Sequence, residues 1–549
     1  MSNSDIADIL KLYADLSELH DGNPFKIKSY AAAAFRIDKM PIKLEGKSLD
    51  ELEKIEGVGK SIAQKIYEIN TTESFTELNE LLQKTPKGVM QIMQIKGLGP
   101  KKVAVIWNEL AIETIGELIY ACTENRLAQA KGFGLKTQAS VIQQIEFMFA
   151  SANKFHYAKV EKTAANLVDE LKTILGENVS VCGTLRRKLE IIDCIEIVVA
   201  DDDFQSAAEE IINASILVDP IFDGTAISGK VANCKVQISL VKNEEYKYQL
   251  FIKTGSENHI AGLALTEINK QNTSEEEIYS ALNLQFIEPE LREGLHEIEK
   301  AKSGTLKKLI EFSDLKGILH NHSTWSDGLN SIEEMANYCI QHQYEYFGIA
   351  DHSKAAFYAK GLKEEQVINQ HIEIDKLNTK LFPFKIFKGT ECDILNDGSL
   401  DYSDDVLKAF DYVVASIHSN LKMNEEKAMH RLLRAIENPH TTILGHPTGR
   451  LLLIREGYPI DHKKIIDACA ANKVVIEINA NPYRLDLDWR WIDYALNKNV
   501  RLSINPDAHE CEGLHDMYYG TLVARKGGLY KEMCLNAMSR DEIAIFFNR

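Results

Sequence analysis

Strand-like and helix-like segments alternate regularly through the C-terminal part of this 549-residue chain. Short apolar runs typical of buried strands recur seven times, and several of them are separated by segments with helical periodicity. This alternation predicts a parallel β/α barrel, in which the carboxyl ends of the strands meet at one face. The strand-like runs cover residues 317–319, 346–350, 384–387, 412–417, 442–445, 474–478 and 501–504. The helical segments cover residues 331–342, 364–381, 424–437 and 461–472.

Each strand-like run is followed by polar side chains, most of them able to bind a metal. A single His at a strand end is usually just a hydrogen-bonded residue, but seven runs in register favour one shared cluster. His320 and His322 are two residues apart, so both project to the same side of an extended segment. The polar residues are His320, His322, Asp327, Asp351, His352, Glu391, His418, His446, Asn479, Asp507 and His509.

This arrangement resembles the polymerase and histidinol phosphatase (PHP) domain over essentially all of residues 315 to 549. The family has a distorted (β/α)7 barrel with a trinuclear metal site. The resemblance implies nine metal ligands, with Glu391 bridging the ions and with both Glu391 and Asp507 also catalytic. Asp351 and Asn479 are expected to orient other groups. The nine are His320, His322, Asp327, His352, Glu391, His418, His446, Asp507 and His509.

The donor types of this set restrict the metal. Six imidazoles and three carboxylates suit Mn²⁺, Zn²⁺ or Fe²⁺ better than Ca²⁺ or an all-oxygen Mg²⁺ site, and Mn²⁺ is the expected ion. Clustered divalent ions lower the pKa of water and stabilise charge on phosphate oxygens. Arg450 and Arg484 follow two of the strands and are candidates for clamping a substrate phosphate, with ordinary salt bridges as the alternative.

The N-terminal region contains an internal repeat. A Gly-x-Gly element between two helical segments occurs three times, with starts 40 and 35 residues apart. One copy alone would read as a helix C-cap, but three copies, each with a Lys soon after, resemble the helix-hairpin-helix motif, which grips the DNA backbone without reading sequence. The expected DNA contacts are Gly57, Gly59, Lys60, Gly97, Gly99, Lys101, Gly132, Gly134 and Lys136.

The middle of the chain resembles the family X DNA polymerases. Strand-like runs at 179–182, 195–200 and 236–241 are separated by other segments. The run from Gly183 through Thr184 to Arg186 and Arg187 looks like the family's nucleotide-phosphate motif, and Gly255 lies in a Thr-Gly-Ser thumb motif. A family X core followed by a PHP barrel resembles bacterial PolX.

The polymerase carboxylates do not match. Two-metal nucleotidyl transfer needs clustered carboxylates on adjacent strands. The family's three Asp positions fall on Cys194, Glu196 and Gln237, so one carboxylate remains. Asp193 lies one residue early, which points its side chain to the opposite face unless a bulge intervenes. We therefore expect synthesis to be absent or weak, with Mg²⁺ needed only if the polymerase is active.

Lys65 aligns with the Lys that forms a Schiff base in the family's deoxyribose phosphate lyases. A Lys placed after a hairpin is more often a phosphate contact. The sequence leaves both roles open, with the phosphate contact favoured.

The organisation is multidomain, with α+β and α/β parts. The nucleotidyltransferase-like palm and thumb stand between helical N-terminal domains and the barrel. We expect a helix-hairpin-helix domain at 1–85, a fingers-like domain with two such motifs at 86–150, a palm at 151–242, a thumb at 243–313 and the PHP domain at 314–549. Whether the barrel docks on the thumb or is tethered through residues 297–303 is left open.

The net charge of −18 argues against nucleic acid as a partner until it is divided along the chain. Residues 1–150 have a balance of only −2, so the acidity lies downstream. Nine cysteines without a C-x-x-C pair, and no long apolar run, indicate a cytoplasmic protein with no membrane partner. We also expect a monomer.

The resemblance implies a metal-dependent 3′-5′ exonuclease or DNA 3′-end phosphodiesterase of DNA repair that acts on gaps and 3′ ends. A gap-filling polymerase that also binds dNTPs is the main alternative. A non-catalytic DNA-binding scaffold is a third possibility. A small-molecule phosphatase would account for the barrel but not for residues 1 to 315.

Overall fold

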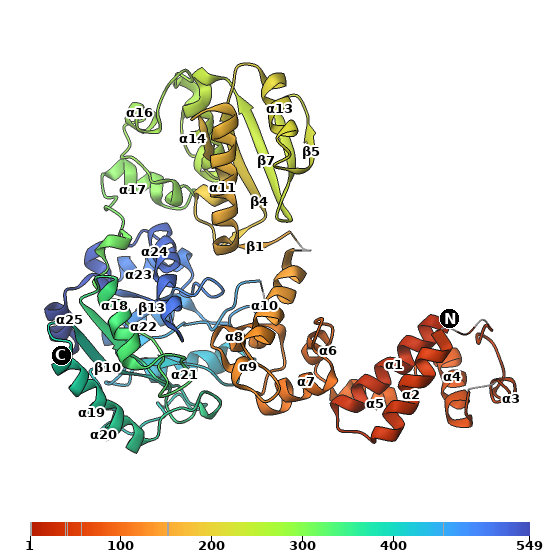
Figure 1. The fold of residues 1–549 in the computed structure, drawn as a ribbon. Coiled ribbons are helices and arrows are strands. Elements are labelled where there is room, and N and C mark those ends of the chain that lie inside the picture. The colour runs from red at the N-terminus through yellow and green to blue at the C-terminus, as the bar shows by residue number, and fades with distance from the viewer. Residues whose placement is uncertain are drawn as a thin grey trace. The chain divides into compact units, whose positions relative to one another are not determined.

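A computed structural model describes residues 3–38, 40, 42–55, 58–150, 153–453 and 455–548 (Figure 1). The chain forms two compact units, Met1–Glu146 and Phe147–Arg549, and each is described by itself. Gly57, an expected DNA contact, lies outside the described residues. No helix within the described ranges is both long and apolar enough to cross a membrane.

The first unit is helical in its described part. Its core forms where α1 packs on α2, and the rings of Tyr13 and Tyr30 meet there at 4.6 Å between centroids. The helices are α1 (Asn3–Leu19), α2 (Pro24–Asp38), α3 (Leu49–Leu52), α4 (Lys60–Thr72), α5 (Thr76–Lys84), α6 (Lys87–Met93), α7 (Pro100–Ala104), α8 (Ile115–Thr123), α9 (Arg126–Gln129) and α10 (Leu135–Ala150).

The described glycines of the three Gly-x-Gly elements lie between two helices, as the repeat predicts. Gly59 and Gly99 are the N-cap residues of α4 and α7. Gly97 and Gly132 have φ of 94° and 86°, a left-handed conformation that glycine adopts without strain. Gly59, Gly97, Gly99, Gly132 and Gly134 have open space where a side chain would begin, so the backbone is accessible at each turn.

The second unit begins with the palm, a five-stranded sheet in the order β2-β4-β7-β6-β5 with helices packed against it. The predicted strands match β2, β4 and β7, and β4 runs parallel to β7. The hairpin of β5 and β6 was not predicted. The elements are β1 (Phe155–His156), α11 (Tyr157–Leu175), β2 (Val179–Val181), α12 (Gly183–Arg186), β3 (Ile191–Ile192), β4 (Cys194–Ala200), α13 (Phe204–Asn213), β5 (Val218–Phe222), β6 (Ala226–Val231) and β7 (Cys234–Val241).

The thumb is built of short helices around the buried rings of Phe251 and Tyr279. Its helices are α14 (Tyr246–Thr254), α15 (Glu257–Ala261), α16 (Glu275–Ala281) and α17 (Glu297–Ser303). Residues 297–303 are therefore a helix of the thumb, with Glu297 buried, and not a tether.

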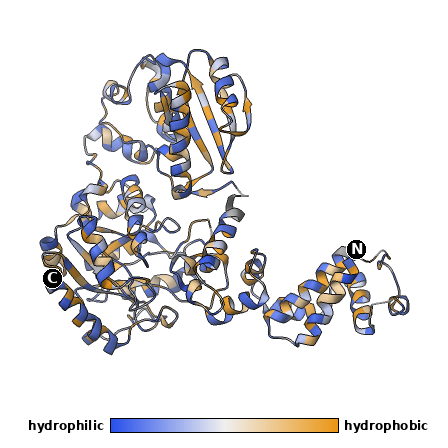
Figure 2. Cartoon of the chain, viewed as in Figure 1, coloured by the Kyte–Doolittle hydropathy of each residue, from blue (hydrophilic) through white to orange (hydrophobic). Residues whose placement is uncertain are grey.

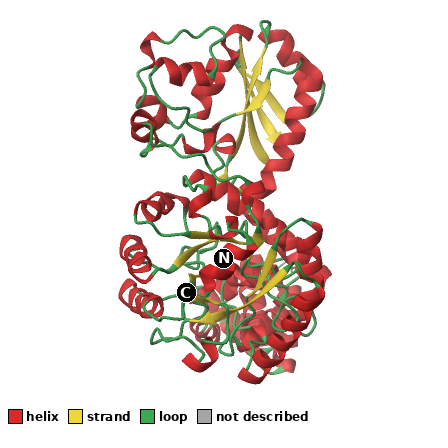
Figure 3. Ribbon diagram, turned by 90° about the vertical axis from the view of Figure 1, so that its left-hand side faces the viewer, coloured by secondary structure: helices red, strands yellow, loops and turns green. Residues whose placement is uncertain are grey.

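The C-terminal barrel holds seven parallel strands in sequential order from β8 to β14. A bridge between Asn321 and Ala508 links the first strand region to the last and nearly closes the barrel. Apolar residues fill the strands, and helices lie outside them (Figures 2 and 3). The strands are β8 (Gly317–Ile318), β9 (Tyr346–Ile349), β10 (Lys385–Asp393), β11 (Tyr412–Ser416), β12 (Ile443–Leu444), β13 (Val475–Asn479) and β14 (Leu502–Asn505). The helices are α18 (Ile332–Gln341), α19 (Glu364–Lys380), α20 (Asp404–Leu407), α21 (Glu425–Ile436), α22 (His462–Asn472), α23 (Ile492–Asn497), α24 (Met517–Lys526) and α25 (Arg540–Phe547).

The predicted barrel is thus confirmed, although two strands extend beyond their predicted ends: β13 includes Asn479, and β10 is longer by several residues. The sequence places Glu391 after a strand of residues 384–387, whereas the structure places it inside β10. The strand is longer because its first half pairs with β9 and its second half, Gly389–Asp393, pairs with β11. This stagger is typical of closed barrels, and it keeps Glu391 at the barrel's carboxyl end.

The barrel docks directly on the palm and thumb. Glu190 of the palm accepts hydrogen bonds from Trp489 and Arg490 of the barrel, each at 3.1 Å. Lys526 and Arg525 of α24 pair with thumb glutamates at 2.5 and 2.6 Å. Tyr519 and Leu522 of α24 also pack on the palm core. Docking rather than tethering is therefore what the structure shows.

Candidate metal centre

Nine potential ligands converge at the carboxyl end of the barrel, and all are buried or nearly so. His320 and Asp507 have φ of 58° and 54°, a left-handed conformation that costs a non-glycine residue about 1 kcal/mol or more. That strain is stored where the two side chains enter the cluster. Three overlapping groups form, and within each the ligand atoms lie within 4.8 Å of one another. They are His322-Asp327-His352-His509, His320-His322-Glu391-Asp507 and His352-Glu391-His418.

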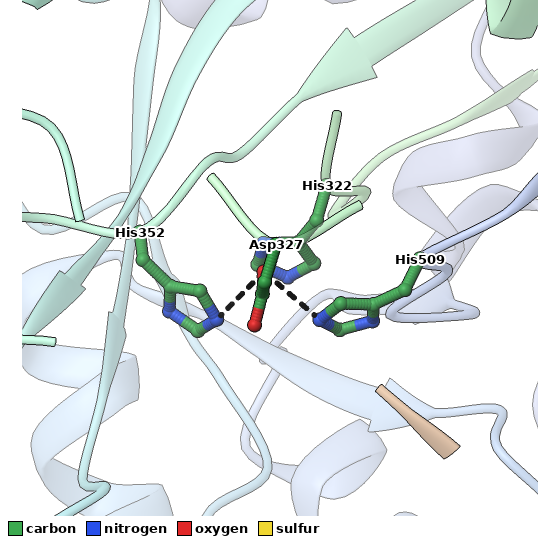
Figure 4. A group of neighbouring side chains, drawn as sticks. All are labelled: His322, Asp327, His352 and His509. Carbon is green, nitrogen blue, oxygen red and sulfur yellow. Dashed lines mark ion pairs between the residues drawn. The ribbon is translucent and has the colours of Figure 1, made fainter. Parts of the chain in front are cut away.

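The first group draws its side chains from three separate parts of the barrel (Figure 4). The carboxylate of Asp327 lies between two imidazoles, at 3.7 Å from His352 Nε2 and 3.4 Å from His509 Nε2. The rings of His322 and His509 stack with centroids 4.2 Å apart. Oxygen and nitrogen donors thus face a common point.

Glu391 lies at the centre of the whole cluster. Its Oε1 is 2.9 Å from His446 Nε2 and 3.1 Å from His418 Nε2, and its Oε2 is 3.0 Å from His352 Nδ1. His320 Nε2 lies 3.3 Å from Oε1. A carboxylate contacted on both oxygens by imidazoles from four strand ends has the placement of a bridging ligand.

Several buried atoms of the cluster have no hydrogen-bond partner among the described residues. They include Nε2 of His320, His352 and His418, Nδ1 of His446 and Oε2 of Glu391. Some of these atoms lie at ion-pair distance from one another, but without the geometry of a hydrogen bond. Leaving buried polar atoms without hydrogen bonds is unfavourable unless something else binds them. Converging nitrogen and oxygen atoms of this kind suit divalent metal ions, so the donor set fits a metal site.

The electrostatics of the cluster are dominated by close opposite charges. Burial alone would raise the pKa of Glu391, but the surrounding His418, His320 and His352 hold it well below its usual value. Burial lowers the pKa of His322 to about 3, assisted by His509 and His352. Burial also opposes the charge of His320 and His418, but the carboxylates next to them outweigh it and raise the pKa of both well above the usual value. A metal that binds these two imidazoles therefore displaces their protons.

Two further carboxylates stand behind the ligands and were missed by the sequence reasoning. Glu477 Oε2 lies 2.6 Å from His320 Nδ1, and Asp393 contacts His418 Nδ1. A carboxylate behind a histidine fixes the tautomer, so that Nε2 faces the metal. An acidic residue inside an apolar strand was the available signal for Glu477.

Asp351 and Asn479, which the sequence analysis expects to orient other groups, are both buried and hydrogen-bonded near the cluster. Asp351 accepts hydrogen bonds from Ser323, Ser326 and Gln370, and burial raises its pKa to about 6. The amide of Asn479 donates to Asp507 Oδ2 at 3.0 Å. Each holds the segment or side chain of a ligand in place.

The two candidate phosphate-binding arginines differ. Arg450 forms an ion pair with Asp488 and donates hydrogen bonds to the carbonyl oxygens of Arg484 and Leu485. This is the ordinary salt bridge that the sequence left open as the alternative role of Arg450. Arg484 is only 2% exposed, and its charge helps to lower the pKa of His446, after the larger effect of burial. Positive charge beside the cluster therefore comes from Arg484.

In the palm, Glu196 and Gln237 are direct neighbours in the register of β4 and β7, and Cys194 faces Lys235. The register runs without a bulge from Cys194 to Ala200, and Asp193 lies exposed before the strand. Among the described residues, no group of three metal-binding side chains forms in the palm.

The run from Gly183 to Arg187, which resembles a nucleotide-phosphate motif, contacts the thumb. Arg186 binds Glu275 through two hydrogen bonds of 2.6 and 3.0 Å, and Arg187 binds Glu293 at 2.9 Å. The backbone N–H of Thr184 donates to Glu196 at 3.3 Å, and Gly183 has φ of 57° with Glu196 packed against its Cα. Gly255 ends α14 and packs on Ile260.

In the first unit, Lys65 is surrounded by carboxylates. Its Nζ lies 2.6 Å from Glu77 and 3.2 Å from Glu68. Burial lowers the pKa of Lys65, but these hydrogen bonds outweigh it and raise the pKa. Lys60, Lys101 and Lys136 are exposed, in the first turns of the helices that follow the glycines.

Comparisons with known proteins agree with this architecture. Three family models match, described as a helix-hairpin-helix domain (residues 1–75), a SAM-like helix-hairpin-helix tandem (residues 89–146) and a PHP domain (residues 319–481). The chain is 34% identical to the DNA polymerase/3′-5′ exonuclease PolX of Bacillus subtilis over 572 residues, covering 100% of both proteins. It is 30% identical over 149 residues to a probable phosphatase of Caldanaerobacter subterraneus, covering 24% of this chain and 56% of the relative.

Proposed function

Because this chain belongs to the bacterial family X DNA polymerases that carry a PHP domain, we propose that its barrel is a metal-dependent 3′-5′ exonuclease or DNA 3′-end phosphodiesterase. The substrate is DNA with a gap or a free 3′ end, and the role is DNA repair. The palm and thumb bind this DNA but synthesise weakly or not at all.

The contrast between the two potential catalytic sites supports this proposal. The barrel brings eight metal-binding side chains into overlapping groups and holds a ninth, His446, against Glu391, whereas the palm keeps only Glu196 of the three expected carboxylates. Gln237 beside it carries no charge, and Lys235 adds a positive one on the same strand. Such a palm face is poorly suited to hold two Mg²⁺ ions.

The expected cofactors are three divalent ions, with Mn²⁺ first and Zn²⁺ or Fe²⁺ as alternatives. When bound, such ions supply Lewis acidity, activating water and stabilising charge on phosphate oxygens. Glu391 and Asp507 are the carboxylates proposed to bring the ions together, and Asn479 holds Asp507 in place. Arg484 would add positive charge for the substrate phosphate.

The first unit would deliver the substrate. Its three glycine turns leave backbone accessible, and Lys60, Lys101 and Lys136 lie exposed beside them. Phosphate contacts of this kind bind DNA without regard to sequence. A near-neutral charge balance over residues 1–150 is compatible with this local grip.

The decisive experiment incubates a 5′-labelled primer-template with Mn²⁺, with and without dNTPs. We expect shortening in both conditions and no shortening with Asp507→Ala. Glu345→Gln, at the opposite end of the barrel, should behave as wild type. Full activity of purified Asp507→Ala would overturn the assignment.

Other outcomes identify the alternatives. Lengthening with dNTPs that Glu196→Ala abolishes would show an active gap-filling polymerase. Binding without any change in primer length would show a non-catalytic scaffold. Hydrolysis of small phosphomonoesters without action on DNA would indicate a phosphatase. A monomeric, cytoplasmic protein remains a prediction from the sequence.

A further inference from the structure

An exposed aromatic side chain stands beside the metal centre. Phe357 is 78% exposed, in a short 3₁₀ turn (Phe357–Ala359) between β9 and α19. Loops that follow the carboxyl ends of barrel strands surround the active end of such barrels. Phe357 therefore belongs to the rim around the nine ligands.

The loop that carries Phe357 is fixed at both ends. It leaves the barrel at His352, and the backbone N–H of Leu362 returns to the carbonyl oxygen of His352 at 2.8 Å. Gly361 passes so close to Ser353 O that a Cβ there would lie 1.8 Å from it. The start and the end of the loop are thus held together at His352, one of the nine potential metal ligands.

The residues around Phe357 are buried or hydrogen-bonded, whereas its own ring is largely exposed. Ala356 and Ala359 are both fully buried, and the N–H of Ala359 donates to Ala356 O at 2.9 Å. The N–H of Ala355 donates to Asp401 at 2.6 Å. The turn therefore holds the phenylalanine ring out toward solvent on a rigid base.

Aromatic contacts connect this ring to the site. The Tyr358 ring lies 6.5 Å from the His352 ring between centroids, and the Phe357 ring lies 5.8 Å from that of Tyr358. Phe357 is thus two ring contacts away from a metal ligand. A phosphate held at the cluster would place its neighbouring nucleobases in this region.

We propose that Phe357 is the stacking platform for a nucleobase at the 3′ end of the DNA substrate. This inference rests on the proposed nuclease function and adds the residue that makes the barrel prefer polynucleotides to small phosphate esters. Stacking on an aromatic ring is tolerant of sequence because every base has a flat face. Lys354, which pairs with Glu364 at 2.5 Å, and Lys360 are exposed on the same loop, where a DNA phosphate could compete for their charge.

Single exposed hydrophobic residues are common on protein surfaces and need no function. The barrel provides a matched example in Phe382, which is 80% exposed. Phe382 precedes β10, at the opposite end of the barrel from the cluster. The two phenylalanines have the same exposure and differ in their distance from the site, so they make a direct comparison.

The test measures nucleotide release from the 3′ end of a single-stranded oligonucleotide with Mn²⁺. Phe357→Ala should lower kcat/KM by about 5- to 100-fold, mainly through KM, as expected for one lost stacking contact. Phe357→Trp should retain activity. Phe382→Ala should match the wild type.

A second substrate separates stacking from a structural effect. On an oligonucleotide whose last two nucleotides are abasic, Phe357→Ala and the wild type should be equally active, because no base is present to stack. An equal loss on the abasic and the base-bearing oligonucleotides would overturn the proposal, as would an undiminished kcat/KM on the base-bearing one.

A cross-linking readout does not depend on turnover. An oligonucleotide with 5-iodouracil at its 3′ end and a phosphorothioate linkage before it is irradiated with the full-length protein. We expect the covalent link to map to Phe357 by mass spectrometry, and a link only to other residues would overturn the proposal. Absence of nucleotide release by the wild type would instead refute the nuclease assignment, so the two failures are distinguishable.

Discussion

Glu477 Oε2 lies 2.6 Å from His320 Nδ1, and both side chains are fully buried. The same carboxylate accepts hydrogen bonds from the backbone N–H of His446 at 3.2 Å and from the amide of Asn479 at 3.1 Å. Asn479 in turn donates to Asp507. One residue of β13 therefore positions ligands from three other strand ends of the barrel.

Glu477→Gln should weaken metal binding. An amide carries no charge to support His320, and its NH₂ group would face a ring nitrogen or a backbone donor. Loss of such a partner behind a ligand typically lowers metal affinity by about 10- to 100-fold. The measurement is metal content by mass spectrometry after dialysis, together with titration of Mn²⁺ into the metal-free protein.

Glu345→Gln is the control for this change, because Glu345 lies at the other end of the barrel, where it pairs with Lys316. It should bind as much metal as the wild type. Excess Mn²⁺ should restore Glu477→Gln toward wild-type occupancy, whereas a misfolded variant would not recover. Unchanged affinity would show that Glu477 does not position the ligands.

The residue pattern predicted the barrel because its strands and their polar ends recur in order. It did not predict Glu477 as a functional residue, since Val474 to Ile478 reads as one apolar strand with an acidic residue inside it. Which face that residue occupies depends on the closed barrel. Asp393 was missed because its partner His418 follows the neighbouring strand, β11, 25 residues further along the chain.

The palm shows a similar limit to what the sequence can predict. The resemblance assigned two of the family's Asp positions to Glu196 and Gln237, and the strand register has these two residues as direct partners. The role of Arg186 was harder to predict, since its partner Glu275 lies 89 residues away in the thumb. The periodicity of a sequence indicates local structure. An ion pair between residues 89 positions apart depends instead on how the palm and thumb pack.

Lys65 should not form a Schiff base at neutral pH. The amine must be neutral to attack a sugar aldehyde, and Glu77 and Glu68 raise the pKa of Lys65. Borohydride treatment with an incised abasic duplex should therefore give no more cross-linked protein than Lys65→Ala gives. A strong cross-link that disappears in Lys65→Ala would establish the lyase role.

The three lysines after the glycine turns should contribute to the salt dependence of DNA binding. Replacing Lys60, Lys101 and Lys136 with Ala should reduce the slope of log K against log salt by about 3, since each phosphate contact contributes roughly 0.9. Anisotropy titrations at several salt concentrations measure this slope. Replacement of Lys43, Lys47 and Lys54 removes the same charge elsewhere in the unit. An equal effect on the slope there would contradict phosphate binding at the glycine turns.

The buried ion triad between palm and thumb should make stability depend on pH. Glu275 pairs with Arg186 at 2.6 Å and with Arg292, which is fully buried, at 2.9 Å. Burial opposes the charge of Glu275, but hydrogen bonds from the two arginines lower its pKa to about 2. Because this folded-state pKa lies below the ordinary value, the charged form stabilises the fold above about pH 4.5.

That contribution, about 3 kcal/mol at pH 7, should disappear as the pH falls from about 4.5 to about 2. Glu275→Gln leaves two arginines without their carboxylate and should lower the free energy of unfolding by roughly 3–5 kcal/mol at neutral pH. Urea unfolding followed by circular dichroism at pH 7 and pH 3 should show the deficit of Glu275→Gln shrinking to about half at pH 3, because the unfolded wild-type chain, with the ordinary Glu pKa, then binds a proton that the folded protein does not. Glu276→Gln, at an exposed position of the same helix, should unfold like the wild type at both pH values. A deficit that is equal at both pH values would mean that Glu275 stabilises the junction by packing and not by its charge.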